Sequence, residues 1–166
     1  LIIPIAALAY LAGANAVVNA TRVGAPGTAL AINASDGGAL VAQSNQKWAA
    51  GVQQGKVLDL SGAARKALRT APLSGGALRL MGFGANTKGD AKRAERLNLL
   101  ATKVTRREKG AQLWLMEAAV ARNDIKGALA RYDFLLATDN SVRDQLFRQL
   151  ELALADPEIR VAFIPY

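Results

Sequence analysis

The sequence predicts an all-α protein in which an N-terminal transmembrane helix is followed by a series of short helices. The first charged side chain is Arg22, so residues 1–21 are uncharged. Apolar residues make up 51% of the chain and aromatic ones only 5%, which favours closely packed Ala- and Leu-rich helices because these residues lose little on entering a helix. Downstream, apolar residues recur at helical spacing, and no useful run of period-2 alternation occurs.

We expect residues 1–22 to form the transmembrane anchor. The run from Leu1 to Ala12 is almost wholly apolar, and about 20 such residues span the hydrocarbon core of a bilayer. Asn15 and Asn19 weaken the end of this run, so an uncleaved signal peptide and a buried core helix remain alternatives. The sequence starts without Met and without a basic flank, so we expect further residues upstream.

Small residues on this segment could let a neighbouring membrane helix approach closely; they are Ala9, Ala12 and Gly13. The positive-inside rule does not set the orientation, because Arg22 is the one basic residue close to the segment. A single short N-terminal anchor most often leaves the following domain outside the cytoplasm. We therefore expect a single-pass inner-membrane protein with a periplasmic globular part.

The rest of the chain divides by its turn residues. Residues 23–27 mix Gly and Pro with small residues and are expected to form a linker. Residues 28–72 are expected to form an irregular helical segment, and residues 73–166 helical repeats with C-terminal capping helices. An amphipathic stripe in the repeat region supports helix; its members are Ile125, Ala128, Leu129, Tyr132 and Leu136.

A repeat is visible when the chain is compared with itself at a shift of about 34 residues. The shift aligns Met81-Gly82 with Leu115-Met116, Gly89-Asp90 with Asn123-Asp124, Ala94 with Ala128, and Ala101 with Leu135. An apolar-small pair, a Gly-Asp turn, an Ala in the second helix and an aromatic four residues later, here Tyr132, resemble the tetratricopeptide repeat. The resemblance is best over residues 76–140 and implies a helix-turn-helix α-solenoid.

The chain departs from that family at three positions. Asn98 stands where an aromatic is expected, Met116 replaces a small residue, and Asn140 replaces the closing Pro. A non-repeat helical bundle therefore remains the alternative. As a whole the segment also resembles uncharacterised membrane-anchored tetratricopeptide-like proteins of Gram-negative bacteria, which implies a fold but no chemistry.

In tetratricopeptide repeats the first helices line a concave binding face. On that resemblance the candidate protein-binding residues are Arg79, Phe83, Asn86, Leu113 and Glu117. Trp48 and Trp114 are each expected to pack in the core, with an exposed binding hot spot as the alternative.

Composition argues against catalysis. The chain has no histidine and no cysteine, which removes imidazole bases, thiolates, disulfides and nearly every zinc, haem or iron-sulfur ligand set. The acids stand singly, so no catalytic carboxylate pair is expected. Glycines between Gly82 and Gly89 suggest a phosphate loop, but their order is not a Walker motif and no strand precedes them. We expect a protein that is no enzyme and uses no metal or cofactor.

The net charge of +8 is unevenly spread, because residues 1–126 carry 17 basic and seven acidic side chains, and residues 127–166 carry four and six. Such a surface could contact nucleic acid, anionic lipid or an acidic partner, or could simply be solvated. Aromatic and basic residues do not interleave, so we expect no nucleic-acid partner. The cluster Arg106, Arg107 and Lys109 is expected to stabilise the last carbonyls of the preceding helix, with an anion contact as the alternative.

Together these features predict a non-catalytic accessory or scaffolding subunit of an inner-membrane complex. Its partners would be other protein subunits and membrane lipid. The alternative is a stand-alone periplasmic adaptor that binds peptides or protein segments in its groove.

Overall fold

The computed structural model describes the chain over residues 2–164. Side-chain surroundings are described from Ala7 onward, except at Ala9, Val142, Gln145, Glu158 and Ala162. Every regular element in the described part is helical, which confirms the all-α prediction. The elements are α1 (Ile2–Thr21), α2 (Pro26–Ile32), α3 (Gly37–Gln53), α4 (Ser61–Thr70), α5 (Gly75–Thr87), α6 (Ala91–Val104), α7 (Lys109–Ala121), α8 (Ile125–Thr138), the 3-10 turn η1 (Asn140–Val142), α9 (Arg143–Ala153) and α10 (Pro157–Phe163).

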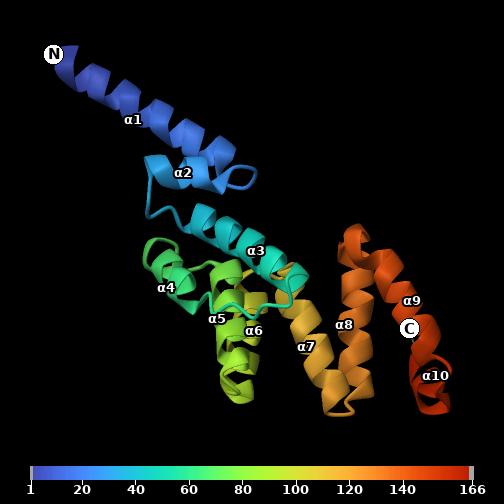
Figure 1. Ribbon diagram of the computed structural model, residues 1–166. Coiled ribbons are helices and arrows are strands. Elements are labelled where there is room, and N and C mark those ends of the chain that lie inside the picture. The colour runs from blue at the N-terminus through green and yellow to red at the C-terminus, as the bar shows by residue number, and fades with distance from the viewer. Residues whose placement is uncertain (1, 165–166) are drawn as a thin grey trace.

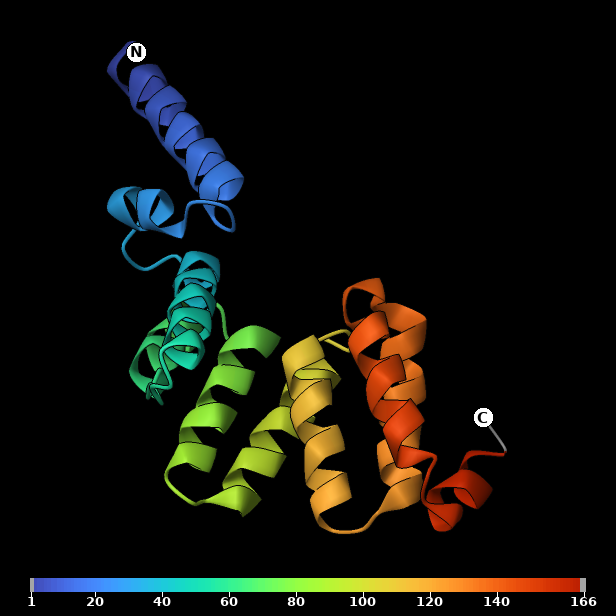
Figure 2. The same ribbon diagram turned by 45° about the vertical axis from the view of Figure 1, so that its right-hand side comes forward.

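The middle of the molecule is a row of three helix pairs. Helices α3 and α4, α5 and α6, and α7 and α8 pack as neighbours, and each pair also packs against the next (Figure 1). Helices α1 and α2 precede the row, while α9 and α10 cover its C-terminal end against α8 (Figure 2). The first helices of neighbouring pairs meet, since α3 contacts α5, and Arg79 of α5 lies against Gly110 of α7.

The second and third pairs repeat with the period seen in the sequence. Helix α7 begins one repeat period after α5, and α8 begins one repeat period after α6. Each first helix is followed by a turn residue with positive φ, which is Gly89 at 77° and Asn123 at 57°. Asp90 and Asp124 then cap the second helices, because their carboxylates accept from the backbone N–H groups three positions on.

Small residues let the paired helices approach closely. Ala94 and Ala101 on α6 are fully buried, and Gly82 on α5 faces Asn98 on α6. A Cβ at Gly82 would lie 2.7 Å from the Asn98 Nδ2, so a larger residue could enter only if Asn98 moved. In the next pair Met116 packs instead against the cluster that contains Tyr132. Asn98 and Met116, two of the three departures from the repeat pattern, thus each lie on the side of their helix that faces the other helix of the pair.

The first pair is less regular than the other two. Helix α4 ends one repeat period before α6, but α3 starts four positions earlier than one period before α5. The four additional residues fall within α3 and the loop that follows it. Helix α2 begins at Pro26, inside the expected linker 23–27, because Pro at a first helical position is already held at helical φ.

Helix α1 extends away from the helix pairs (Figures 1 and 2). Val18 packs against Ala29 and Ala39, while the large apolar side chains described nearer the start are exposed; they are Leu8, Tyr10, Leu11 and Val17. No helix in the described part of the chain combines the length and the apolar character that crossing a membrane requires.

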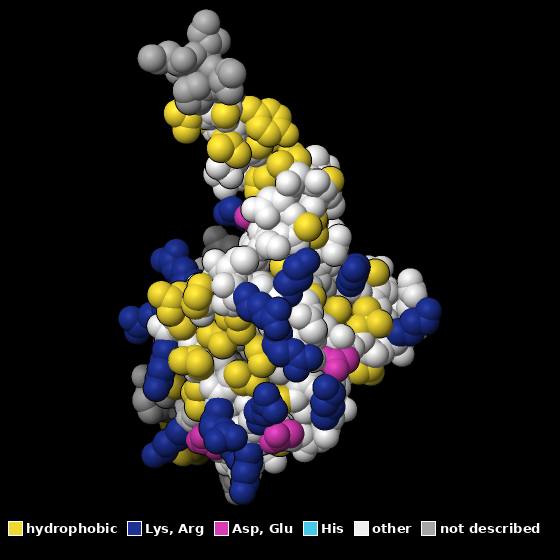
Figure 3. Space-filling model, turned by 90° about the vertical axis from the view of Figure 1, so that its left-hand side faces the viewer, with side chains coloured by type: hydrophobic (Ala, Val, Ile, Leu, Met, Phe, Trp, Pro, Cys, Tyr) yellow, Lys and Arg dark blue, Asp and Glu magenta, His cyan; other side chains and the backbone are white. Residues whose placement is uncertain are grey.

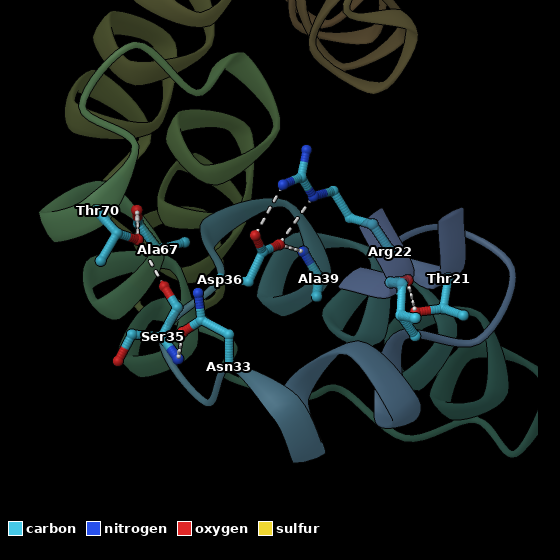
Figure 4. A network of polar contacts seen from close by, with 9 residues as sticks. Thr21, Arg22, Asn33, Ser35, Asp36, Ala39, Ala67 and Thr70 are labelled. Atoms are coloured by element: carbon cyan, nitrogen blue, oxygen red, sulfur yellow. Dashed lines mark hydrogen bonds and ion pairs between the residues drawn. The ribbon is translucent and has the colours of Figure 1, made fainter. Parts of the chain in front are cut away.

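A polar network joins α1 and α2 to the first pair (Figure 4). Arg22 donates two hydrogen bonds to the Asp36 carboxylate, at 2.9 and 2.8 Å. Asp36 also accepts from the backbone N–H of Ala39 at 2.7 Å, which caps α3. Nearby, the Thr70 hydroxyl at the end of α4 donates to the Ser35 carbonyl at 2.7 Å. The Asp36 carboxylate therefore caps the start of α3 and also binds Arg22, which follows α1.

This network makes part of the stability dependent on pH. Burial alone would raise the pKa of Asp36, but the bonds from Arg22 and the Ala39 N–H outweigh it and lower the pKa below its usual 3.8. A depressed pKa in the folded state means that the contribution is complete above about pH 4 and is lost as the pH falls through the folded pKa. We expect Asp36→Asn to lower the free energy of unfolding by about 1 kcal/mol at pH 7 and by less in acid. Urea unfolding at the two pH values measures this, and Asp133→Asn, an exposed change on α8, should show no such pH-dependent difference.

Candidate protein-binding groove

A cavity of about 610 Å³ opens between the first helices of the three pairs. Its wall is formed by α3 and the loop after it, by α5, and by α7 together with the residue that precedes it. The lining residues are Asn45, Trp48, Ala49, Val52, Lys56, Val57, Leu58, Arg79, Phe83, Asn86, Thr87, Glu108, Lys109, Gly110, Leu113, Trp114 and Glu117. We call this cavity the groove.

Arg79 holds the floor of the groove together. Its side chain is 8% exposed and donates from Nε to Glu108 Oε1 at 2.8 Å. A second nitrogen, Nη2, donates to the Asn45 Oδ1 on α3. The guanidinium also lies 5.0 Å from the centre of the Phe83 ring, a cation-π arrangement. One buried cation thus links α3, α5 and the residue that precedes α7.

Aromatic side chains stand above this floor. The rings of Trp48 and Phe83 lie 5.7 Å apart at 41°, so α3 and α5 contribute to one aromatic surface. Trp48 is 41% exposed, Phe83 is half-buried, and Trp114 from α7 is half-buried on the same wall. Three large rings therefore lie partly exposed in one concavity.

All five candidate binding residues line the groove, but their situations differ. Phe83 and Leu113 are half-buried, and Asn86 and Glu117 are exposed at the rim. Arg79 was expected on the contact surface, and instead it is buried and bonded to Glu108 and Asn45, so its donors are largely occupied by the protein itself.

The two tryptophans were expected in the core and instead line the groove. Asn45 and Glu108 also line it, although the sequence did not indicate either of them as a candidate. A signal for α3 was present in the sequence: Asn45, Trp48, Ala49 and Val52 fall at i, i+3, i+4 and i+7. That spacing places them on one helix face, and it is this face that forms the groove.

Among the described residues, the side chains of the basic cluster form no hydrogen bond to the last carbonyls of α6. The Ala101 carbonyl there accepts from the Thr105 N–H, so the chain itself supplies the cap. Lys109 reaches forward to Asp139 at 3.2 Å and to the Ser141 hydroxyl, and Arg106 lies 5.8 Å from the Phe134 ring. Arg107 is exposed. Hydrogen bonds from Ser141, and then from Lys109, lower the pKa of Asp139.

Comparison of the chain with protein-family profiles, with curated proteins and with solved structures finds no match. The tetratricopeptide resemblance therefore rests on the residues of this chain and on the repeated geometry of its helix pairs.

Two acids belong to the lining of the groove. Of its two acids, Glu108 is engaged by Arg79, and Glu117 stands at the rim. In the part of the chain that is described, acids do not gather in a group able to hold a metal ion. The glycines from Gly82 to Gly89 belong to α5 and its C-terminal turn, not to a phosphate loop.

The candidate membrane contacts lie on α1. Ala12 and Gly13 are exposed, and a Cβ at Gly13 would meet no other atom within 4 Å. Ala9 falls among the positions whose side chains are not described. Among the described side chains of α1, small and apolar residues are exposed together with Tyr10, Asn15 and Asn19, while Val18 is buried.

Proposed function

We propose that this protein is a non-catalytic accessory subunit of an inner-membrane protein complex, which it serves by binding a partner segment in the groove. The observation that carries the proposal is the partly exposed aromatic wall of Trp48, Phe83 and Trp114, in a cavity lined by the first helices of three successive pairs. Partly exposed rings of this kind are the usual energetic centres of protein interfaces.

We propose further that the helix pairs form a short tetratricopeptide-like solenoid. The periodic repetition of helix starts, positive-φ turns and Asp caps in α5 to α8 supports this. In such an arrangement each pair covers the apolar side of the previous one, and the first helices share one face. The lining of the groove by α3, α5 and α7 agrees with that geometry.

The groove fits an amphipathic helix or an extended segment with large apolar side chains. Aliphatic residues such as Val52, Leu58 and Leu113 continue the aromatic wall. Lys56 and Glu117 lie at exposed positions along it, so a partner could be oriented by charges of both signs. The apolar side chains of the wall would supply the binding affinity. The charges at the rim would set the direction in which the partner segment lies.

We propose that α1 enters the membrane together with helices of the partner complex. Its described residues carry no charge and expose Leu8, Tyr10 and Leu11. Since the described residues fall short of a self-sufficient spanning helix, a neighbouring helix would cover Asn15 and Asn19, both of which are exposed here. The helix pairs would then lie on the periplasmic side.

Isolation of the protein from membranes in mild detergent tests this proposal. The wild type should co-migrate with a large complex in fixed stoichiometry. The double variant Trp48→Ala, Leu113→Ala should lose association by at least about tenfold, because it truncates two apolar side chains that line the groove, and circular dichroism checks that it stays folded. The matched control is Leu152→Ala, Val161→Ala, which truncates two exposed apolar residues on α9 and α10.

Unchanged association of the groove variant would contradict the proposal. A protein that migrates alone and binds peptides in the groove would support the stand-alone periplasmic adaptor instead. Loss of association in both variants would show that general apolar exposure, and not the groove, is responsible.

A further inference from the structure

Almost all of the net positive charge arises from one stretch of the chain. Residues 61–104 carry nine basic and two acidic side chains, against a net charge of +8 for the whole protein. Seven of the nine are exposed on α4 and α6, and within the described residues none of the seven forms an ion pair; they are Arg65, Lys66, Arg69, Lys92, Arg93, Arg96 and Lys103. Neither α4 nor α6 contributes to the lining of the groove.

The two helices that carry these charges lie over the same part of the core. Leu68 of α4 and Leu97 and Val104 of α6 all pack against one buried cluster. On α6, Lys92, Arg96 and Lys103 fall within a narrow stripe at 100° per residue, facing away from the buried Ala94 and Ala101. We call this surface of α4 and α6 the basic face.

Aliphatic side chains are interspersed with the charges of the basic face. Leu99 and Leu100 are 36% and 45% exposed between Arg96 and Lys103. Leu73, in the loop after α4, is 81% exposed. Figure 3 views the molecule from the side on which α4 lies in Figure 1, and there Lys and Arg side chains surround exposed apolar ones, with few acids among them.

This mixture distinguishes a lipid surface from nucleic acid as the partner. A single-strand binder stacks bases on aromatic rings, and Phe83, the one aromatic residue between 61 and 104, lies in the groove. Exposed leucines contribute nothing to contacts with phosphodiester backbones. At a bilayer, in contrast, Lys and Arg reach the headgroup phosphates while leucines enter the boundary with the acyl chains.

We propose that the basic face binds the surface of a membrane that contains anionic phospholipid. The helix pairs would then lie against the headgroups through α4 and α6. The groove, which is lined by α3, α5 and α7, would stay open to a partner. The proposal rests on the charges and leucines of α4 and α6, and it holds whether or not the groove binds a protein.

A single fluorescent label on the full chain tests this directly, since the sequence contains no cysteine. An environment-sensitive dye on Leu100→Cys is compared with the same dye on Leu152→Cys, an exposed position on α9. Vesicles consist of phosphatidylcholine with or without about 30 mol% phosphatidylglycerol. Since α1 carries no charged side chain, any insertion of α1 should affect both vesicle types alike.

We expect the Leu100→Cys label to report an apolar environment on anionic vesicles alone, and to lose that signal at about 0.5 M salt. The Leu152→Cys label should remain in water. A Leu100→Cys label that stays in water on anionic vesicles, or responds equally to neutral ones, would overturn the proposal.

Variants that remove basic side chains identify which surface of the protein binds the vesicles. In the labelled chain, Arg65→Gln, Arg69→Gln, Lys92→Gln and Arg96→Gln together should weaken docking by at least about tenfold. The control removes the same charge from exposed positions elsewhere, through Lys47→Gln, Arg107→Gln, Lys126→Gln and Arg148→Gln, and should change it far less. Circular dichroism checks that both remain folded. Equal losses in the two variants, or tighter binding of an oligonucleotide than of vesicles through the same four residues, would overturn the proposal.

Discussion

Replacement of Asn98 by Asp is expected to lower the free energy of unfolding by about 3 to 5 kcal/mol at neutral pH. Asn98 is fully buried, its Nδ2 donates to the Ala94 carbonyl at 2.9 Å, and its Oδ1 has no hydrogen-bond partner among the described residues. An ionised carboxylate of the same shape would lose that donor and face the carbonyl oxygen without compensation. Urea unfolding at neutral pH measures the effect.

The loss should shrink in acid. Burial would raise the pKa of the new carboxyl in the folded state, so the destabilisation is complete above that raised pKa and disappears below the unfolded value of about 3.9. The protonated acid could again donate to the Ala94 carbonyl. The control is Asn86→Asp, an exposed change on α5 that should cost less than about 1 kcal/mol. Equal effects of the two changes would show that Asn98 is not packed between α5 and α6.

The second large effect is expected for Arg79→Met, which should lower the free energy of unfolding by about 3 kcal/mol. The change leaves the Glu108 carboxylate, 20% exposed, without its cation, and it leaves the Asn45 Oδ1 without its donor. Because these residues belong to three successive helical units, the loss should also loosen the groove. Chemical denaturation gives the energy, and the fluorescence of Trp48 and Trp114 reports the groove.

A second change distinguishes a broken ion pair from lost packing. Adding Glu108→Leu to Arg79→Met removes the unpaired charge, so most of the lost stability should return. The comparison pair is Arg122 with Glu95, at 51% and 35% exposure, where Arg122→Met should cost less than about 1 kcal/mol. If the two Arg→Met changes cost the same, Arg79 does not link the helices as described.

Much of the C-terminal half could be predicted from the sequence because its information is local. Gly89 and Asn123 tolerate positive φ, Asp90 and Asp124 are good caps, and small residues follow at the repeat period. These features place the turns and thereby the helices α5 to α8. The faces of α5 and α7 follow from that register, and for this reason the five candidate residues all fall on the groove.

The features of the structure that could not be predicted from the sequence depend on contacts between residues far apart in the chain. Helix α3 starts more than one repeat period before α5. The repeat period therefore does not align Trp48 with the residues of α5 and α7 that line the groove. The burial of Arg79 depends on Asn45 and Glu108, which lie 34 and 29 residues away in the chain. Asn98 fits the core because Gly82, on the facing helix, leaves room for it. The repeat pattern considers each position separately, so it indicates only that Asn98 replaces an aromatic residue.

Site-specific photo-crosslinking in native membranes tests the central claim, that a partner segment occupies the groove. A photoreactive residue is placed at Trp48 or at Leu113 inside the groove, and at Ala130 on the exposed side of α8 as the control. The two groove positions should crosslink to the same partner protein in constant yield, and Ala130 should not. Crosslinks at Ala130 that equal those in the groove, or different proteins captured from Trp48 and Leu113, would contradict it.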